Sequence, residues 1–220
     1  MVELSEIKKF CEGKKIIIIG NSSRILDGTH KKIIDNYEVV VRINRGYKED
    51  SYLYADSIGT KTTILSLGVK SATSAATIIQ SNKLKFILCP IIHSENLNYT
   101  NSYAINDEAY QTLKNDLGGF KPSTGISTYN FFNRFVNFMR LDLIGFDFFA
   151  SSVRQRNQLG HCYVEDHHGI KESKYFESSK DPAKTILHEI RGTSANNTVD
   201  NIPRIRNTNR NNFTTKQYRR

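Results

Sequence analysis

Short runs of β-branched and other apolar residues alternate along the chain with stretches in which apolar residues recur every three or four positions. The runs predict strands at residues 15–20, 38–43, 61–65, 85–88 and 141–147. The periodic stretches predict helices at residues 4–11, 72–81, 106–117, 126–138 and 171–177. This alternation is typical of an α/β protein. We expect a single Rossmann-like domain with a mostly parallel sheet flanked by helices.

The chain becomes polar after the last predicted strand. Residues 151–168 are interpreted as a loop, and loops that follow strands are where functional sites lie. From residue 191 onward the sequence is rich in Asn, Thr and Arg with little apolar content. Such a composition is typical of poorly ordered chain. We therefore predict a folded domain over residues 1–190 and a basic tail over residues 191–220.

The formal net charge of +9 is concentrated in that tail. Its last twenty residues hold six basic residues and no acidic one: Arg204, Arg206, Arg210, Lys216, Arg219 and Arg220. Basic tails bind nucleic acids or anionic membrane faces. Because the charge begins where the predicted core ends, we favour peripheral contact with the inner membrane face. A nucleic-acid-binding protein is the less favoured alternative.

Cysteine usage and hydropathy bear on the compartment. No apolar run reaches the eighteen or more residues of a membrane span, and the acidic N-terminus does not resemble a secretory signal. The three cysteines, Cys11, Cys89 and Cys162, lack the spacing of a disulfide framework or a zinc site. We predict a cytoplasmic protein.

The first polar signals follow the predicted strands. Gly20-Asn21-Ser22 ends the first strand, Arg42-Ile43-Asn44 ends the second, and an Asp-Ser-Ile-Gly-Thr-Lys-Thr-Thr stretch follows at residues 56–63. In this order they resemble the large sialyl motif of glycosyltransferase family 29. The segment at residues 122–148 begins Pro-Ser-Thr-Gly, continues through a helix and ends in a strand with Gly-Phe. It is similar to the small sialyl motif of the same family.

A third group of residues lies in the loop after the last strand. His161 and Tyr163 resemble the family's short His and Tyr motif, and His167 with Glu172 resembles its terminal His-x-x-x-x-Glu. The short gap between Tyr163 and His167 is also similar to bacterial sialyltransferases of glycosyltransferase family 42. Animal Golgi members of family 29 have a membrane anchor and a disulfide between the large motifs. Residues 16–47, here called the first sequence block, contain no cysteine. The sequence therefore looks like a bacterial or viral member.

The resemblance implies a sialyltransferase-type variant of the GT-A fold and a catalytic domain over residues 1–190. It implies a CMP-sugar donor, carrying sialic acid or Kdo, and a glycan or glycolipid acceptor. Asn21, Ser22 and Asn44 would contact CMP. An inactive CMP-binding relative is the alternative within this family, and a methyltransferase is disfavoured because no GxGxxG follows the first strand.

The residue types suit that chemistry. Ser123, Thr124 and Gly125 begin a predicted helix, where free backbone N–H groups face an anion and glycine permits close approach. For the two hydroxyls, plain helix capping is the alternative interpretation.

The sequence contains no Asp-x-Asp pair, so we expect no metal and no cofactor beyond the donor substrate. His161 and Tyr163 can instead donate hydrogen bonds to phosphate oxygens. His167 is the candidate general base, with adjacent His168 as the alternative, and a single displacement would invert the anomeric configuration.

Overall fold

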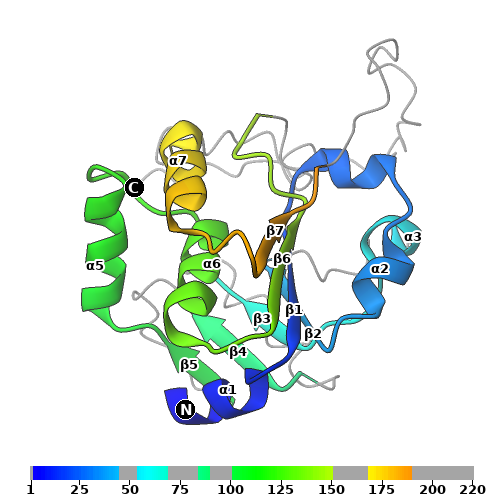
Figure 1. Cartoon of the computed structure of the whole chain (residues 1–220), viewed down its shortest axis with the longest axis horizontal. Helices are drawn as coiled ribbons and strands as arrows, with labels where there is room; N and C mark the ends of the chain where they lie inside the picture. Colours follow the sequence, from blue (N-terminus) through cyan, green and yellow to red (C-terminus); the bar gives the residue numbers. More distant parts are fainter. Residues whose placement is uncertain (1, 45–53, 69–83, 90–100, 151–167, 190–220) are drawn as a thin grey trace, which may run out of the picture.

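The computed structural model describes residues 2–44, 54–68, 84–89, 101–150 and 168–189. These residues form an open sheet of seven strands in the order β5-β4-β3-β2-β1-β6-β7, and all neighbouring strands run parallel (Figure 1). The strands are β1 Lys15–Ile19, β2 Val39–Ile43, β3 Ile64–Ser66, β4 Phe86–Cys89, β5 Ser102–Ala104, β6 Arg140–Ile144 and β7 Thr185–Leu187. The predicted α/β class with a parallel sheet is confirmed.

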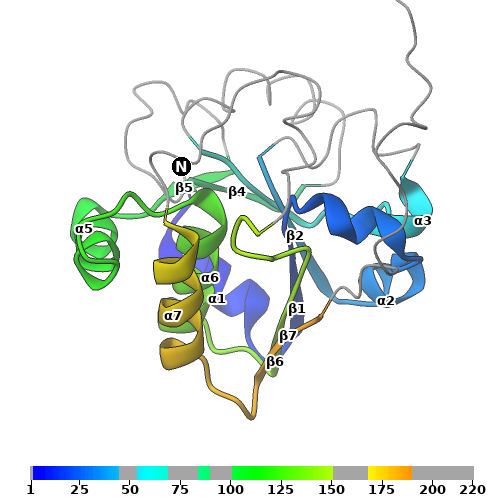
Figure 2. The same ribbon diagram turned by 90° about the horizontal axis from the view of Figure 1, so that it is seen from above.

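Helices cover both faces of the sheet (Figure 2). One face carries α1 Leu4–Cys11, α5 Asp107–Asp116, α6 Thr124–Phe135 and α7 Gly169–Ser179. The other carries the 3-10 helix η1 Ser23–Asp27 with α2 Lys31–Asp35 and α3 Ala55–Ile58. Within the parts of the chain that the structure describes, no helix is both long and apolar enough to cross a membrane.

Strand β1 lies at the centre of two cores. Ile16 and Ile18 pack into the core beneath α1, α6 and α7, whereas Ile17 and Ile19 pack into the core beneath η1 and α2. All four isoleucines are at most 2% exposed. A strand that is apolar at every position is what a parallel sheet covered on both faces requires. This explains why the sequence shows a continuous run of isoleucines and no alternation.

A buried carboxylate holds the edge strand β7 against β6. Asp142 accepts hydrogen bonds from His188 Nε2 at 2.7 Å, from Arg140 Nε and Nη2 at 2.7 Å each, and from the Tyr37 hydroxyl. Burial alone would raise the pKa of Asp142, but these hydrogen bonds outweigh it and lower the pKa to about 2. Asp142 therefore remains ionised, and its bond to His188 fixes the end of β7.

Most predicted elements are present, with shifted ends. The helix predicted at residues 126–138 begins two residues earlier, at Thr124, because Ser123 caps it. Strands β5 and β7 and the short helices η1, α2 and α3 were not predicted. Each is only three to five residues long, too short to show a period. The predicted helix at 72–81, the tail at 191–220 and all of the predicted loop at 151–168 except His168 lie outside the described residues.

Candidate functional site

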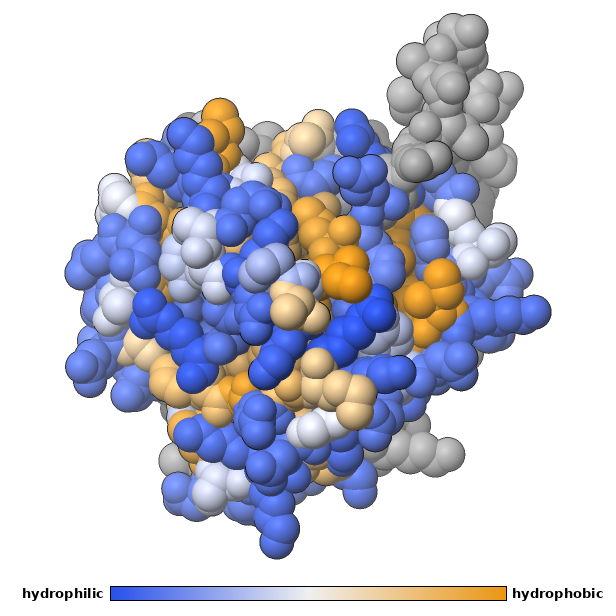
Figure 3. Space-filling model, in the orientation of Figure 1, coloured by the Kyte–Doolittle hydropathy of each residue, from blue (hydrophilic) through white to orange (hydrophobic). Residues whose placement is uncertain are grey.

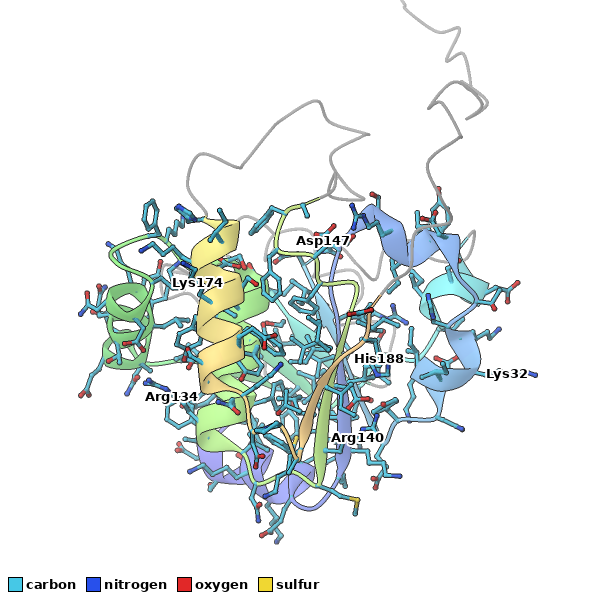
Figure 4. The ribbon with its side chains drawn as sticks, turned by 45° about the horizontal axis from the view of Figure 1, so that its top comes forward. Lys32, Arg134, Arg140, Asp147, Lys174 and His188 are labelled. Carbon is cyan, nitrogen blue, oxygen red and sulfur yellow. The ribbon has the colours of Figure 1, made fainter. Side chains whose placement is uncertain are left out.

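The polar residues predicted to bind a ligand gather at the carboxyl edge of the sheet. The chain runs outward from β1 to β5 and then returns to the other side of β1 with β6. This reversal is the topological switch point, where open α/β sheets bind ligands. Asn21 and Ser22 follow β1, and Asn44 follows β2. Asp147 follows β6 at the same edge (Figure 4). The prediction that Asn21 and Asn44 lie at one edge of the sheet, at the ends of adjacent strands, is confirmed. Asp147 was not among the predicted site residues.

Two glycines bring the turns after β1 and β6 into backbone contact. The N–H of Gly20 donates to Ile144 at 2.7 Å, and the N–H of Ser22 donates to Gly145 at 3.0 Å. A Cβ on Gly20 would lie 2.2 Å from the carbonyl oxygen of Gly145, which no side chain can tolerate. The turns after β1 and β6 are thus in direct backbone contact, and the Phe146 ring also lies close to Gly20.

Asn44 connects the first sequence block to the segment at residues 122–148, here called the second sequence block. It adopts a left-handed backbone with φ of 51°, a conformation that asparagine tolerates better than most residues. Its side-chain Oδ1 accepts from the N–H of Gly68 at 2.7 Å, and its Nδ2 donates to the Thr124 hydroxyl at 3.3 Å. The amide therefore fixes a loop on one side and the start of α6 on the other.

Of the two polar atoms in the Asn21 side-chain amide, one has a hydrogen-bond partner among the described residues and the other has none. Its Nδ2 donates to the carbonyl of Ile43 at 3.3 Å, which fixes the orientation of the amide. Its Oδ1 is buried and has no hydrogen-bond partner among the described residues. A buried polar atom without a partner is costly unless a ligand or water supplies one. This atom is a fitting acceptor for a hydroxyl or amine of a ligand at the switch point.

The hydroxyl of Ser22 already has two partners within the protein. It donates to Asp147 Oδ2 at 2.9 Å and accepts from the N–H of Arg24 at 3.2 Å, where it caps η1. The contact with Asp147 links the turns after β1 and β6. The predicted contact of Ser22 with the CMP part of the donor substrate stays a prediction.

The backbone N–H groups at the N-terminus of α6 face the same carboxyl edge of the sheet. Ser123 caps the helix by accepting from the N–H of Ile126 at 3.3 Å. The N–H groups of Thr124 and Gly125 have no partner within the described residues. A Cβ on Gly125 would meet the Phe146 ring at 2.9 Å, so the backbone there packs tightly against the turn after β6. This is the arrangement of an anion site at a helix start.

Glu172 holds this helix start in place from α7. Its two carboxylate oxygens accept from the N–H and the hydroxyl of Ser123, each at 2.8 Å, and its side chain is almost fully buried. Burial raises the pKa of Glu172 to about 7, against the opposing effect of the two hydrogen bonds. The terminal His-x-x-x-x-Glu spacing pointed to Glu172 but not to its partner Ser123.

The predicted histidines are only partly described. His168 caps α7, its Nδ1 accepting from the N–H of Lys171 at 3.4 Å, and its ring packs edge-on against Phe120 at 4.6 Å. His161, Tyr163 and His167 lie outside the described residues, so their roles stay predictions. No cluster of three or more His, Cys, Asp or Glu side chains suited to a metal occurs within the described parts of the chain.

The parallel sheet thus carries, at its switch point, a helix start that is a candidate anion site. Residues 6–115 match the model of glycosyltransferase family 29 (sialyltransferase), which is half of the chain. The chain therefore belongs to glycosyltransferase family 29 and is a glycosyltransferase. The match contains the first sequence block, and the second block lies beyond it.

Two solved structures share the fold. A mammalian sialyltransferase in complex with Gal-beta-1-3GalNAc-ortho-nitrophenol superposes with a TM-score of 0.55 at 20% identity, over 86% of this chain and 74% of that one. Another mammalian sialyltransferase structure gives a TM-score of 0.53 at 16% identity, over 80% of this chain and 69% of that one. No curated protein matches the chain in sequence.

Proposed function

We propose that the chain transfers a sialic acid or a related sugar acid such as Kdo from a CMP-sugar to a hydroxyl of a glycan or glycolipid. One observation carries this proposal. The start of α6 is fixed at the switch point by Asn44 and Glu172, and its first two N–H groups have no partner in the described part of the chain. The phosphate of CMP is the anion that membership of the family suggests for this place.

Each residue of the edge then has a chemical task. The N–H groups of Thr124 and Gly125 bind the phosphate, and the buried Oδ1 of Asn21 accepts from the ribose or the base. Breaking the glycosidic bond leaves a phosphate anion, which His161 and Tyr163 stabilise with hydrogen bonds.

The acceptor hydroxyl loses its proton to a histidine as it attacks the anomeric carbon. His167 is the proposed base, with His168 as the alternative. A single displacement of this kind inverts the anomeric configuration and needs no metal. The proposal includes a cytoplasmic location and contact of residues 191–220 with an anionic membrane face.

A thermal-shift comparison of CMP, CDP, UDP, GDP and S-adenosylmethionine tests the donor assignment. At one hundred times its dissociation constant a ligand adds about 2.7 kcal/mol to the unfolding free energy, so CMP should raise the melting temperature clearly. Asn21→Ala should reduce that shift, whereas Asn115→Ala, on the exposed side of α5, should not. Equal shifts with every nucleotide, or a response to S-adenosylmethionine alone, would contradict the assignment.

A further inference from the structure

A basic and apolar surface lies beside the candidate site, where the end of α5 meets the start of α7. We call it the α5–α7 shoulder and define it as Phe120, Ile170, Lys171 and Lys174. Phe120 is 39% exposed and Ile170 is 66% exposed, and both lysines are also exposed. Figure 3 shows a hydrophobic spot at the top of the α7 region with hydrophilic surface beside it.

Contacts between the two elements make the shoulder one continuous surface. The Phe120 ring packs against the ring of His168, which caps α7. The Lys171 ammonium lies close to the turn that ends α5, 3.6 Å from where a Cβ on Gly118 would be. The patch therefore joins two segments that are about fifty residues apart in the sequence.

The helical period of α7 turns its apolar and basic residues outward together. Glu172 and Phe176 are buried against α6, so they define the inner side of α7. Ile170 and Lys174 are four positions apart and lie on the outer side, with Lys171 next to them. The large exposed Ile170 is thus not part of the core, and its exposure follows from the register of the helix.

Among the described residues, the carboxylates at the end of α5 and on α7 have other partners. Asp116 pairs with Arg134 at 3.2 Å, and Glu177 pairs with Lys180 at 2.6 Å. Glu172 is buried against Ser123. These three acids therefore do not neutralise Lys171 and Lys174.

We infer that the α5–α7 shoulder docks on a membrane surface that contains anionic lipids. An aromatic and an aliphatic side chain surrounded by lysines is the pattern of an interfacial membrane contact, in which apolar groups enter the headgroup boundary and lysines meet lipid phosphates. Docking there would hold the carboxyl edge of the sheet close to the bilayer. The inference rests on the shoulder alone, and it holds whatever sugar the enzyme transfers.

The absence of tryptophan from the sequence makes a direct test possible. Phe120→Trp in the full chain places a single indole in the shoulder, and Ile170→Trp is a second reporter should the first fold poorly. Met139→Trp is the matched control, because Met139 is 57% exposed and precedes β6 at the opposite, amino edge of the sheet. Each protein is mixed with phosphatidylcholine vesicles, with and without phosphatidylglycerol, and with brominated lipids.

We expect a blue shift and bromolipid quenching for Phe120→Trp with phosphatidylglycerol vesicles and neither for Met139→Trp. Lys171→Gln with Lys174→Gln should weaken vesicle binding roughly fivefold per lysine. Lys32→Gln, on α2 across the sheet, should leave it unchanged (Figure 4). Indoles at positions 120 and 170 that stay unquenched overturn the inference, whether the vesicles bind the chain through its tail or not at all. Equal quenching at position 139 also overturns it.

Discussion

Neutralising Glu172 should change how the stability of the protein depends on pH. The carboxyl group is almost fully buried, and its pKa rises from 4.5 to about 7 because burial disfavours the charged form. A raised carboxyl pKa means that the folded protein binds the proton more tightly than the unfolded chain does. Its contribution to the unfolding free energy is therefore fully present below pH 4.5 and is lost as the pH rises through about 7.

The size of this contribution follows from the pKa change. Raising a carboxyl pKa from 4.5 to about 7 corresponds to about 3 kcal/mol, at roughly 1.4 kcal/mol for each tenfold change in proton affinity. Glu172→Gln keeps an oxygen that can accept from the N–H of Ser123, but it does not titrate. We expect the wild type to lose about 3 kcal/mol relative to Glu172→Gln between about pH 4.5 and pH 8.

Urea unfolding at several pH values measures this difference. The comparison with the variant is needed because other groups titrate in the same range; burial lowers the pKa of His30, whose contribution grows as the pH rises and so opposes that of Glu172. Glu177→Gln is the matched control, since Glu177 lies on the same helix but is 55% exposed beside Lys180. Parallel stability curves for the wild type and Glu172→Gln would refute the reasoning.

Four further outcomes are expected. His167→Ala should lower turnover about a hundredfold with CMP affinity unchanged, and the same loss in His168→Ala instead would move the base by one residue. Asn44→Ala should weaken CMP binding by roughly 1–3 kcal/mol in a calorimetric titration. EDTA should leave turnover intact, and a loss restored by manganese or magnesium would contradict the proposed metal-free reaction. Gly20→Ala should cost more than about 2 kcal/mol in denaturant unfolding, since its Cβ would overlap the carbonyl of Gly145.

The sequence predicted the parts of the fold that local physics determines. A run of four isoleucines has no stable place except a strand buried on both faces, so β1 could be predicted from its own residues. Strand β5 could not, because Ser102, Tyr103 and Ala104 have no strand-like pattern. They form a strand because their backbone pairs with β4. The same holds for β7, which depends on β6 and on the buried Asp142.

The candidate site was predictable to a similar extent. Asn21 and Asn44 could be placed at one edge because both follow strands that run in the same direction. Their hydrogen bonds could not be predicted, because each amide reaches a partner on a different element. The clamp of Glu172 on Ser123 joins residues 49 positions apart, and no local pattern encodes that pairing.

The position of β1 between β2 and β6 has a consequence for how the chain folds during synthesis. Ser22 and Asp147, which are hydrogen-bonded to each other, are 125 residues apart. Strand β1 can therefore pair with β6 only after a stretch of that length has been translated. At about 5–20 residues per second this takes roughly 6–25 s. During that time β1 presents an apolar strand with one unpaired edge, the kind of edge that promotes aggregation. Chains released before residue 144 should therefore aggregate, and slow translation upstream of β6 should increase the demand for chaperones.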